Sequence, residues 1–416
     1  MKMRKSALLS VILSVVCIIL LVSCPNFTKF LKHINDELFK VRGTVVECPA
    51  GKPLVSVEVF VNDYQYSELT NSEGDYEIEL PEGKWNLNFV KDNFTSEVVE
   101  VNVGPQNPRE EITTCLLKTT SELSTIVIAD RGNNRIAQIK DMDGNGWTSY
   151  GTTGSGTDQF NGPVDLARDS QGRIYISDRW NHRIVRIDDM NGTNWKIFGT
   201  SGSLTDQFQY PLGLAIDKYD RIYIGDNHNH RVVRIDNMDG DGWVNYGTNG
   251  VGDDEFQYPA GVAVDDSIRI FVADSWNDRI VRVDDLSGAG WKTLGTTGYG
   301  INQFIGPVGV AVATGKIYVA DHGHQEYDPY DPYRIIRADD MDGTGWTSFG
   351  GAGSGVGQFD HPYKITVGPD QRLYIADLNN NRIIRVDNMT GAGWKEYGIE
   401  GSGDHQLKTP TSILVY

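Results

Sequence analysis

An aspartate, an asparagine, a histidine and an arginine lie close together in residues 176–184, ISDRWNHRI. A carboxylate beside an imidazole is a pair that general acid–base catalysis uses, so the stretch is a candidate active site. Related strings begin at residues 128, 224, 272 and 375, and a longer version begins at residue 319. Catalytic groups are normally present once, whereas scaffold groups recur in every copy of a repeat. The repetition therefore predicts that Asp178 and Arg183 belong to the scaffold.

The aspartate recurs in six copies, and an arginine follows five residues later in five of them. A charged group buried at the edge of a repeat must be paired or hydrogen-bonded. We therefore expect each aspartate to cap its loop and each arginine to fork onto backbone carbonyls or to pack between repeats. The aspartates are Asp130, Asp178, Asp226, Asp274, Asp321 and Asp377. Six recurring tryptophans are expected to be packing residues: Trp147, Trp195, Trp243, Trp291, Trp346 and Trp394.

The elements that hold these residues repeat with a period near 48 residues. The unit that starts at Gly162 contains four alternating apolar segments, GPVDLARD, GRIYISD, HRIVRIDD and NWKIFG, which predict four short strands joined by Gly, Asp and Asn turns. Four strands per repeat are typical of a propeller blade. The first copy lacks its innermost strand, and the chain ends on one, TPTSILVY. We expect these halves to complete one blade, which closes a propeller of six blades without an open edge.

The repeated string, with its QF, proline, GVAVD variants, IYVAD and NxRI, resembles the NHL repeat over residues 124–416. The resemblance implies an all-β chain whose main domain is a six-bladed β-propeller. Most NHL propellers are interaction surfaces, so the resemblance also implies a protein, peptide or glycan ligand.

Residues 1–23 have a basic start and an apolar run, which is typical of an export signal. The string LVSC at 21–24 resembles the lipobox of bacterial lipoproteins, which implies that Cys24 carries lipid and anchors the chain to a membrane. The expected location is the bacterial cell envelope, outside the cytoplasm, in the periplasm or at the cell surface. Residues 24–40 are polar and mixed, and we interpret them as a tether.

Residues 41–118 alternate in a way that predicts a small β-sandwich, and the run GKPLVSVEVFV followed by GDYEIELPEGKW resembles the carboxypeptidase regulatory-like domain. The resemblance implies a transthyretin-like spacer without catalysis of its own. Cys48 lies near the first strand and Cys115 near the last. Outside the cytoplasm these two cysteines could form a disulfide, or they could remain separate buried thiols.

The net charge of −18 excludes a nucleic-acid partner, because nothing in the sequence offers the basic stripe that releases condensed counterions. Removal of residues 1–23 takes away three basic groups and no acidic group, so the charge falls to −21.

Function should lie where the copies differ, and the histidines and several aromatic residues fall in two loop classes that emerge on one face of a propeller. Exposed aromatic and adaptable polar groups are typical of a binding surface. The predicted ligand-binding residues on this face are Trp180, His182, His228, His230, Trp276, His322, His324, Tyr327, Tyr330, Tyr333 and His361.

A second departure from the repeat lies two residues after the proline of each first strand. Gly213, Gly261 and Gly309 are expected there at the mouth of the central channel, whereas three other copies hold Asp165, Lys364 and Ser412. We predict that these three polar side chains cluster on one side of the mouth. They could orient a polar ligand, or Asp165 and Lys364 could form a solvated ion pair.

The sequence is compatible with an enzyme as well as with a binding scaffold. The insertion HGHQEYDPYDPY contains two histidines and three carboxylates, so a zinc-type site is conceivable, and DMDGNGW and DNMDGDGW resemble half of a calcium loop. The amidating lyase that shares the NHL propeller binds zinc through histidines directly after the first-strand proline. Here those positions hold Val164, Leu212, Ala260, Val308, Tyr363 and Thr411. No cofactor is therefore predicted, calcium or zinc remains an alternative, and a metal-dependent lyase or hydrolase is the alternative function.

Overall fold

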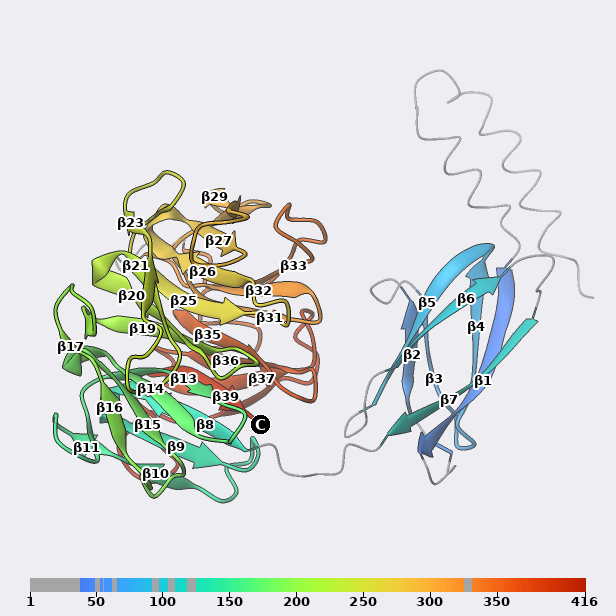
Figure 1. Cartoon of the computed structure of the whole chain (residues 1–416). Coiled ribbons are helices and arrows are strands. Elements are labelled where there is room, and N and C mark those ends of the chain that lie inside the picture. The colour runs from blue at the N-terminus through green and yellow to red at the C-terminus, as the bar shows by residue number, and fades with distance from the viewer. Residues whose placement is uncertain are drawn as a thin grey trace, which may run out of the picture. The chain divides into compact units, whose positions relative to one another are not determined.

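The computed structural model describes residues 38–48, 53–54, 56–61, 66–91, 97–103, 109–117, 125–324 and 331–416. The chain divides into two compact units, Met1–Glu122 and Leu123–Tyr416 (Figure 1). The predicted signal peptide, Cys24 and residues 25–37 lie outside the described residues. In the described part of the chain, no helix is long and apolar enough to cross a membrane.

The first unit contains two sheets that enclose one apolar core. One sheet has the order β4 (Asp75–Pro81), β1 (Leu38–Cys48), β7 (Arg109–Leu117), and the other has the order β3 (Tyr66–Leu69), β2 (Glu58–Val61), β5 (Gly83–Val90), β6 (Glu97–Val103). Alternate residues point inward, as Tyr76, Ile78 and Leu80 do on β4. This alternation is what a strand with one buried face requires.

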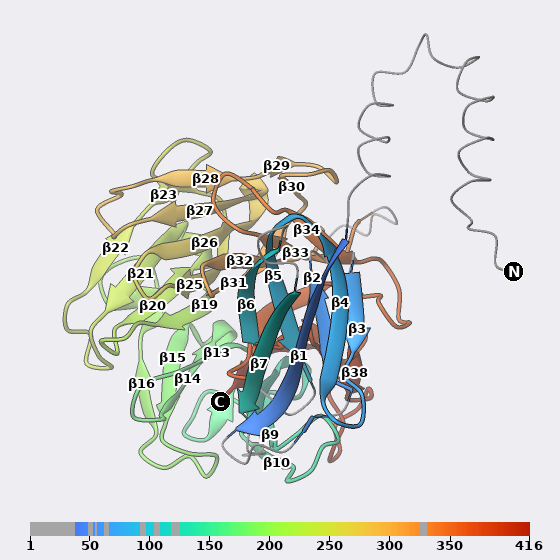
Figure 2. The ribbon, with the colours of Figure 1, turned by 90° about the vertical axis from the view of Figure 1, so that its right-hand side faces the viewer.

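The two cysteines of this unit lie on neighbouring parallel strands. β1 and β7 lie side by side in Figure 2, and their register places Cys115 beside Val46 and Cys48 beside Leu117. The side chains of both cysteines lie outside the described residues, so their pairing stays a prediction.

The second unit is a ring of six four-stranded antiparallel sheets, which confirms the predicted six-bladed propeller. Blade 1 contains β39 (Pro410–Val415), β8 (Ile126–Asp130), β9 (Arg135–Ile139) and β10 (Thr148–Tyr150); blade 2 contains β13 (Pro163–Arg168), β14 (Ile174–Asp178), β15 (Arg183–Ile187) and β16 (Lys196–Phe198); blade 3 contains β19 (Pro211–Ile216), β20 (Ile222–Asp226), β21 (Arg231–Ile235) and β22 (Val244–Tyr246). Blade 4 contains β25 (Pro259–Val264), β26 (Ile270–Asp274), β27 (Arg279–Val283) and β28 (Lys292–Leu294); blade 5 contains β31 (Pro307–Ala313), β32 (Lys316–Asp321), β33 (Arg334–Ala338) and β34 (Thr347–Gly350); blade 6 contains β35 (Pro362–Val367), β36 (Leu373–Asp377), β37 (Arg382–Val386) and β38 (Lys395–Tyr397).

Short elements lie in the loops between these strands. The loops that lead into the next blade contain two-stranded parallel pairs: β11 (Thr152–Thr153) with β12 (Gln159–Phe160), β17 (Thr200–Ser201) with β18 (Gln207–Phe208), β23 (Thr248–Asn249) with β24 (Glu255–Phe256), and β29 (Thr296–Thr297) with β30 (Gln303–Phe304). Single 3₁₀ turns follow the second strands of blades 1 to 4: η1 (Arg131–Asn133), η2 (Arg179–Asn181), η3 (Asn227–Asn229) and η4 (Ser275–Asn277).

The last strand of the chain supplies the innermost strand of the first blade. β39 pairs antiparallel with β8, and the amide and carbonyl of Tyr416 exchange hydrogen bonds with those of Thr125 at 3.1 and 2.8 Å. Figure 1 marks the C-terminus beside these two strands. The ring therefore closes through backbone hydrogen bonds inside one blade.

The innermost strands crowd together around the ring axis, and this crowding explains the recurring glycine. A Cβ atom at Gly213 would lie 2.3 Å from the carbonyl oxygen of Ala260 in the next blade. The equivalent distances at Gly261 and Gly309 are 2.4 and 2.5 Å. The backbones meet there without room for a side chain, so these glycines are packing residues.

Candidate functional site

The repeated aspartate and arginine hold each blade to the loop that precedes it. The Asp178 carboxylate accepts hydrogen bonds from the Asn161 amide at 2.7 Å, the Asn181 side chain at 2.8 Å and Arg183 Nε at 2.7 Å. The Arg183 guanidinium also donates to the carbonyls of Ser155 and Gln159. Burial raises the pKa of Asp178, and these donors oppose that effect. The predicted scaffold role is confirmed.

The residue directly before each arginine joins neighbouring blades. His182 Nδ1 accepts a hydrogen bond from the Tyr210 amide of blade 3 at 3.1 Å, and His230 Nδ1 accepts one from the Tyr258 amide of blade 4 at the same distance. The side chains of Asn134, Asp278 and Asn381 accept an amide of the next blade in the same way. His182 and His230 therefore have a structural role that the sequence interpretation did not include.

A central pocket of about 500 Å³ lies on the face that carries these loops. Its wall is a ring of six residues, one from each blade, and each directly follows the repeated aspartate. These ring residues are Arg131, Arg179, Asn227, Ser275, His322 and Leu378. Because the preceding aspartate is fixed by the scaffold, this position is fixed in every blade while its residue type varies.

A continuous series of rings runs across blades 2 to 5, and four of its six members line the pocket. We call it the aromatic arc: His182, Tyr210, His228, Tyr258, Trp276 and His324. Successive centroids lie 4.5 to 6.2 Å apart, within or near the range of aromatic contacts. Trp276 remains 57% exposed. The arc therefore offers flat apolar faces at the rim of a polar pocket.

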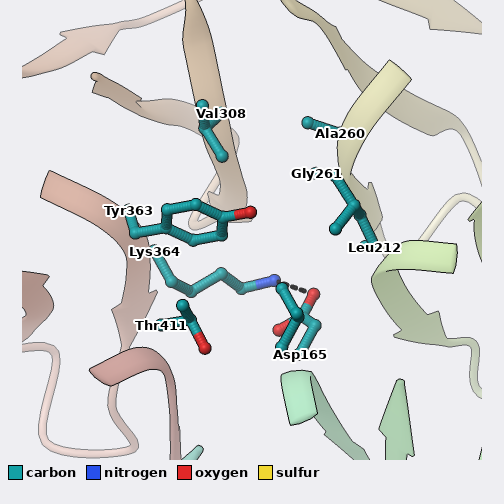
Figure 3. A pocket seen from close by; sticks show the side chains of 10 residues that line it. Asp165, Leu212, Ala260, Gly261, Val308, Tyr363, Lys364 and Thr411 are labelled. Carbon is teal, nitrogen blue, oxygen red and sulfur yellow. Dashed lines mark hydrogen bonds and ion pairs between the residues drawn. The ribbon is translucent and has the colours of Figure 1, made fainter. Parts of the chain in front are cut away.

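The floor of the pocket is apolar. Val164, Leu212, Ala260 and Val308 form one buried cluster, and Tyr363 packs against it. Figure 3 shows Leu212, Ala260, Val308 and Tyr363. Each of these residues directly follows the proline of a first strand. The amidating lyase that shares the NHL propeller has zinc-binding histidines at those positions. The floor separates the central pocket from the layer of Asp165 and Lys364.

The polar cluster of Asp165, Lys364 and Ser412 forms, but it is buried, so the prediction of a solvated ion pair at the channel mouth was wrong. Lys364 Nζ lies 2.8 Å from Asp165 Oδ2 (Figure 3), and the Ser412 hydroxyl donates to Asp165 Oδ1 at 2.7 Å. Asp165 is only 4% exposed. The adjoining cavity of about 10 Å³ has space for about one water molecule. The apolar floor covers these groups, and they satisfy one another.

The central pocket is positively charged although the chain is strongly acidic. Among the described residues that line it, none is aspartate or glutamate. Burial lowers the pKa of Arg131, and the nearby charge of Arg179 lowers it further. Loss of solvent and then the charge of Arg179 likewise lower the pKa of His228. The two arginines thus act on groups around the same pocket.

Two further histidines of the pocket have opposite electrostatic environments. Burial lowers the pKa of His322 to about 3, so its imidazole is neutral near pH 7. A hydrogen bond to Asp278 raises the pKa of His324, whose Nε2 lies 3.3 Å from Asp278 Oδ1. The cation that His324 forms is therefore already balanced by a carboxylate.

The structure brings five of the predicted ligand-binding residues together at the central pocket: His228, Trp276, His322, His324 and His361. Trp180 is 45% exposed but packs over Gly162, outside the pocket lining. The expectation of an exposed Tyr333 was wrong, because this side chain is 5% exposed and stacks on His361. Tyr327 and Tyr330 lie outside the described residues.

Sequence reasoning missed Arg131, Arg179, Tyr210 and Tyr258. The first two were visible as DRGNNR and DRWNHR, where other repeats hold an uncharged residue after the aspartate. Tyr210 and Tyr258 both have φ of +54°, at a position where Gly162 and Gly306 stand in other blades. A large side chain in the left-handed region is uncommon and marks such a position for attention.

No metal centre is found in the part of the chain that the structure describes: no three or more His, Cys, Asp or Glu residues are placed to hold an ion. In the candidate calcium loop, the Asp141 carboxylate accepts hydrogen bonds from the amides of Asp143 and Asn145 within its own turn. This arrangement agrees with the hairpin-turn interpretation.

A comparison with protein families gives a match at the blades described above. The family described as NHL repeat matches residues 160–187, 208–235 and 256–282, which lie in blades 2, 3 and 4. These blades carry NHL repeats. The chain thus contains an NHL-type β-propeller, as its sequence resemblance implied. No curated protein sequence matches the chain.

Solved structures share the fold at low sequence identity. A nidogen/laminin complex matches with a TM-score of 0.51 and 16% identity, over 70% of this chain and 98% of that chain. A protein of unknown function from Bacteroides caccae matches with a TM-score of 0.50 and 12% identity, over 71% and 99%. A streptogramin B lyase structure gives a TM-score of 0.46 and 14% identity, over 67% and 81%. The first two matches support the propeller fold of the NHL unit.

Proposed function

We propose that the protein is a membrane-anchored, extracytoplasmic binding scaffold whose NHL propeller recognises a protein, peptide or glycan ligand in the central pocket. The observation that carries the proposal is the pocket itself, about 500 Å³ in volume and lined by residues that differ from blade to blade. Ligand pockets typically have volumes of about 300–1,000 Å³ and a few convergent polar groups. The repeated residues are occupied in holding the blades together, which leaves the non-repeated ones for recognition.

The anchor and location in this proposal rest on the N-terminal sequence. The basic start, the apolar run and the string LVSC at 21–24 support lipidation of Cys24 and export from the cytoplasm. The sandwich unit would then separate the propeller from the membrane. The nidogen/laminin structure belongs to a complex, and protein binding is compatible with the same fold here.

The test is binding of the purified full-length chain to arrays of peptides and glycans. The variant Trp276→Ala with His228→Ala removes two rings of the aromatic arc and should weaken binding about tenfold or more, because exposed aromatic anchors dominate most binding surfaces. Tyr219→Ala is the matched control, since Tyr219 is 65% exposed in the hairpin between β19 and β20 on the opposite face. Equal binding by all three proteins would contradict the proposal.

A further inference from the structure

Two arginines of the central pocket have no carboxylate partner among the residues that the structure describes. Arg131 and Arg179 come from neighbouring blades and form no ion pair with any described residue, whereas Lys364 and His324 are both paired with aspartates. Arg179 Nε is buried without a hydrogen-bond partner. Arginine carries a positive charge at any relevant pH, so both guanidiniums are charged and share one cavity.

Two charged guanidiniums in one cavity destabilise the folded protein while no anion is bound. Like charges in a partly desolvated site repel each other more strongly than they do in bulk water. Each guanidinium also presents donors that its neighbours leave unused. The chain contains 56 acidic residues, yet none of the described residues that line the pocket is acidic. Within the described lining, the positive charge of the two arginines is therefore not balanced by a carboxylate.

The donors of the pocket also lie near its flat apolar surfaces. His322 Nδ1 is buried without a hydrogen-bond partner in the same wall, and the guanidinium carbon of Arg179 lies 5.8 Å from the ring centroid of Tyr210 in the aromatic arc. A guanidinium pair suits the planar oxygens of a carboxylate or the oxygens of a phosphoryl group. The arc suits a ring or an aliphatic part attached to that group.

We infer that the central pocket binds a small oxoanion-bearing ligand, with the anionic group held between Arg131 and Arg179 and the attached part resting on the aromatic arc. The inference rests on the proposed binding function of the pocket and adds the charge of the ligand. Carboxylate and phosphoryl groups share the chemistry that the arginines recognise, so the experiment has to separate them.

The experiment measures thermal unfolding of the purified full-length chain with increasing inorganic phosphate, galacturonate or neutral galactose. At least one anion should raise the unfolding temperature in a saturable way, because it binds only the folded state. Phosphate and galacturonate distinguish a phosphoryl group from a carboxylate. Galactose should have no effect, and added sodium chloride should weaken the anion's effect by screening.

The variants Arg131→Gln and Arg179→Gln should each weaken anion binding about tenfold or more. In the absence of anion they should keep or raise the unfolding temperature, because each relieves charge repulsion; a structural arginine would give a loss instead. Arg168→Gln is the matched control, since Arg168 lies at the opposite mouth of the channel and stacks on Tyr416. This variant should bind anions like the wild type.

Two results would overturn the inference. One is that no anion stabilises the wild type more than galactose does, and the other is that the Arg131 and Arg179 variants respond to anions as the Arg168 variant does. A peptide or glycan from the arrays could depend on Trp276 while both arginine variants respond to anions like the wild type. In that case the proposed binding function stands, and the inference that the ligand is an anion is wrong. If anions bind but no array ligand depends on Trp276, the anion site survives without the proposed recognition of larger ligands.

Discussion

His182 and His230 each use Nδ1 to accept an amide proton from the next blade, and this role ties blade packing to protonation. Burial lowers the pKa of both imidazoles below the ordinary value of 6.5. As the pH falls below about 6.5, the two imidazoles therefore become protonated in the unfolded chain at a higher pH than in the folded protein. The stability that these histidines contribute is fully present above that pH and is lost as the pH falls through their folded pKa.

Replacing both histidines by asparagine should preserve the inter-blade bonds, since Asn134 and Asn381 already make them. The unfolding free energy at pH 7.5 should change by no more than about 1 kcal/mol, whereas alanine at either site leaves a partly buried amide unpaired and costs about 1–3 kcal/mol. The asparagine variant should also lose less stability than the wild type between pH 7.5 and 5.5. Denaturant unfolding at both pH values measures these effects. Equal losses of unfolding free energy in the asparagine and alanine variants would show that the hydrogen bond to the next blade does not contribute to stability.

Residue types alone did not separate scaffold histidines from pocket histidines. The sequence indicated that all of these histidines lie on one face of the propeller. Four of them, His228, His322, His324 and His361, line the central pocket on that face. Which neighbouring blade a side chain reaches depends on loop geometry that alternation does not encode. The same reason explains the buried Asp165–Lys364 pair, because Leu212, Ala260 and Val308 of the apolar floor come from blades 3, 4 and 5, which neither Asp165 nor Lys364 belongs to.

The strands themselves were predictable because each blade repeats one pattern of alternation and turns. The expected second strand, GRIYISD, corresponds to β14 at Ile174–Asp178, and the expected third strand to β15 at Arg183–Ile187. The first repeat lacks an innermost strand and the last segment of the chain supplies one, which also indicated how the ring closes. The parallel pairing of β1 with β7 was not predicted, since neither strand carries a signal for its partner.

The closing strand yields a prediction about β39. Deleting residues 410–416 should remove the innermost strand of blade 1 and the Ser412 bond to Asp165, and should lower the unfolding temperature by many degrees or abolish cooperative unfolding. Moving the segment in front of Thr125 through a short turn should restore most of the loss, because Tyr416 and Thr125 are already hydrogen-bonded neighbours. Calorimetry of the two variants provides the measurement. Failure of the transposed variant to recover would show that closure needs more than this strand pairing.

The whole chain is built from two units with separate cores. Among the described side chains, the apolar cluster of the first unit contains residues from Val41 to Val103, and those of the second begin at Ile126. The propeller produced alone as Leu123–Tyr416 should therefore unfold within a few degrees of its transition in the full chain. A decrease of ten degrees or more in the isolated unit would indicate that the sandwich stabilises it.

At the level of the whole molecule, the acidic surface and the basic pocket define where ligands can bind. The net charge of −18 opposes anions in general, so an anion that binds must use the uncompensated charge of Arg131 and Arg179. Anion binding is therefore expected at one place on one face of the propeller.

The most direct test of this claim is a crystal structure of the purified protein soaked with phosphate or galacturonate. We expect density for the anion within hydrogen-bonding distance of both Arg131 and Arg179, above the apolar floor of the central pocket. Anion density at the opposite channel mouth beside Arg168, with an empty central pocket, would contradict it.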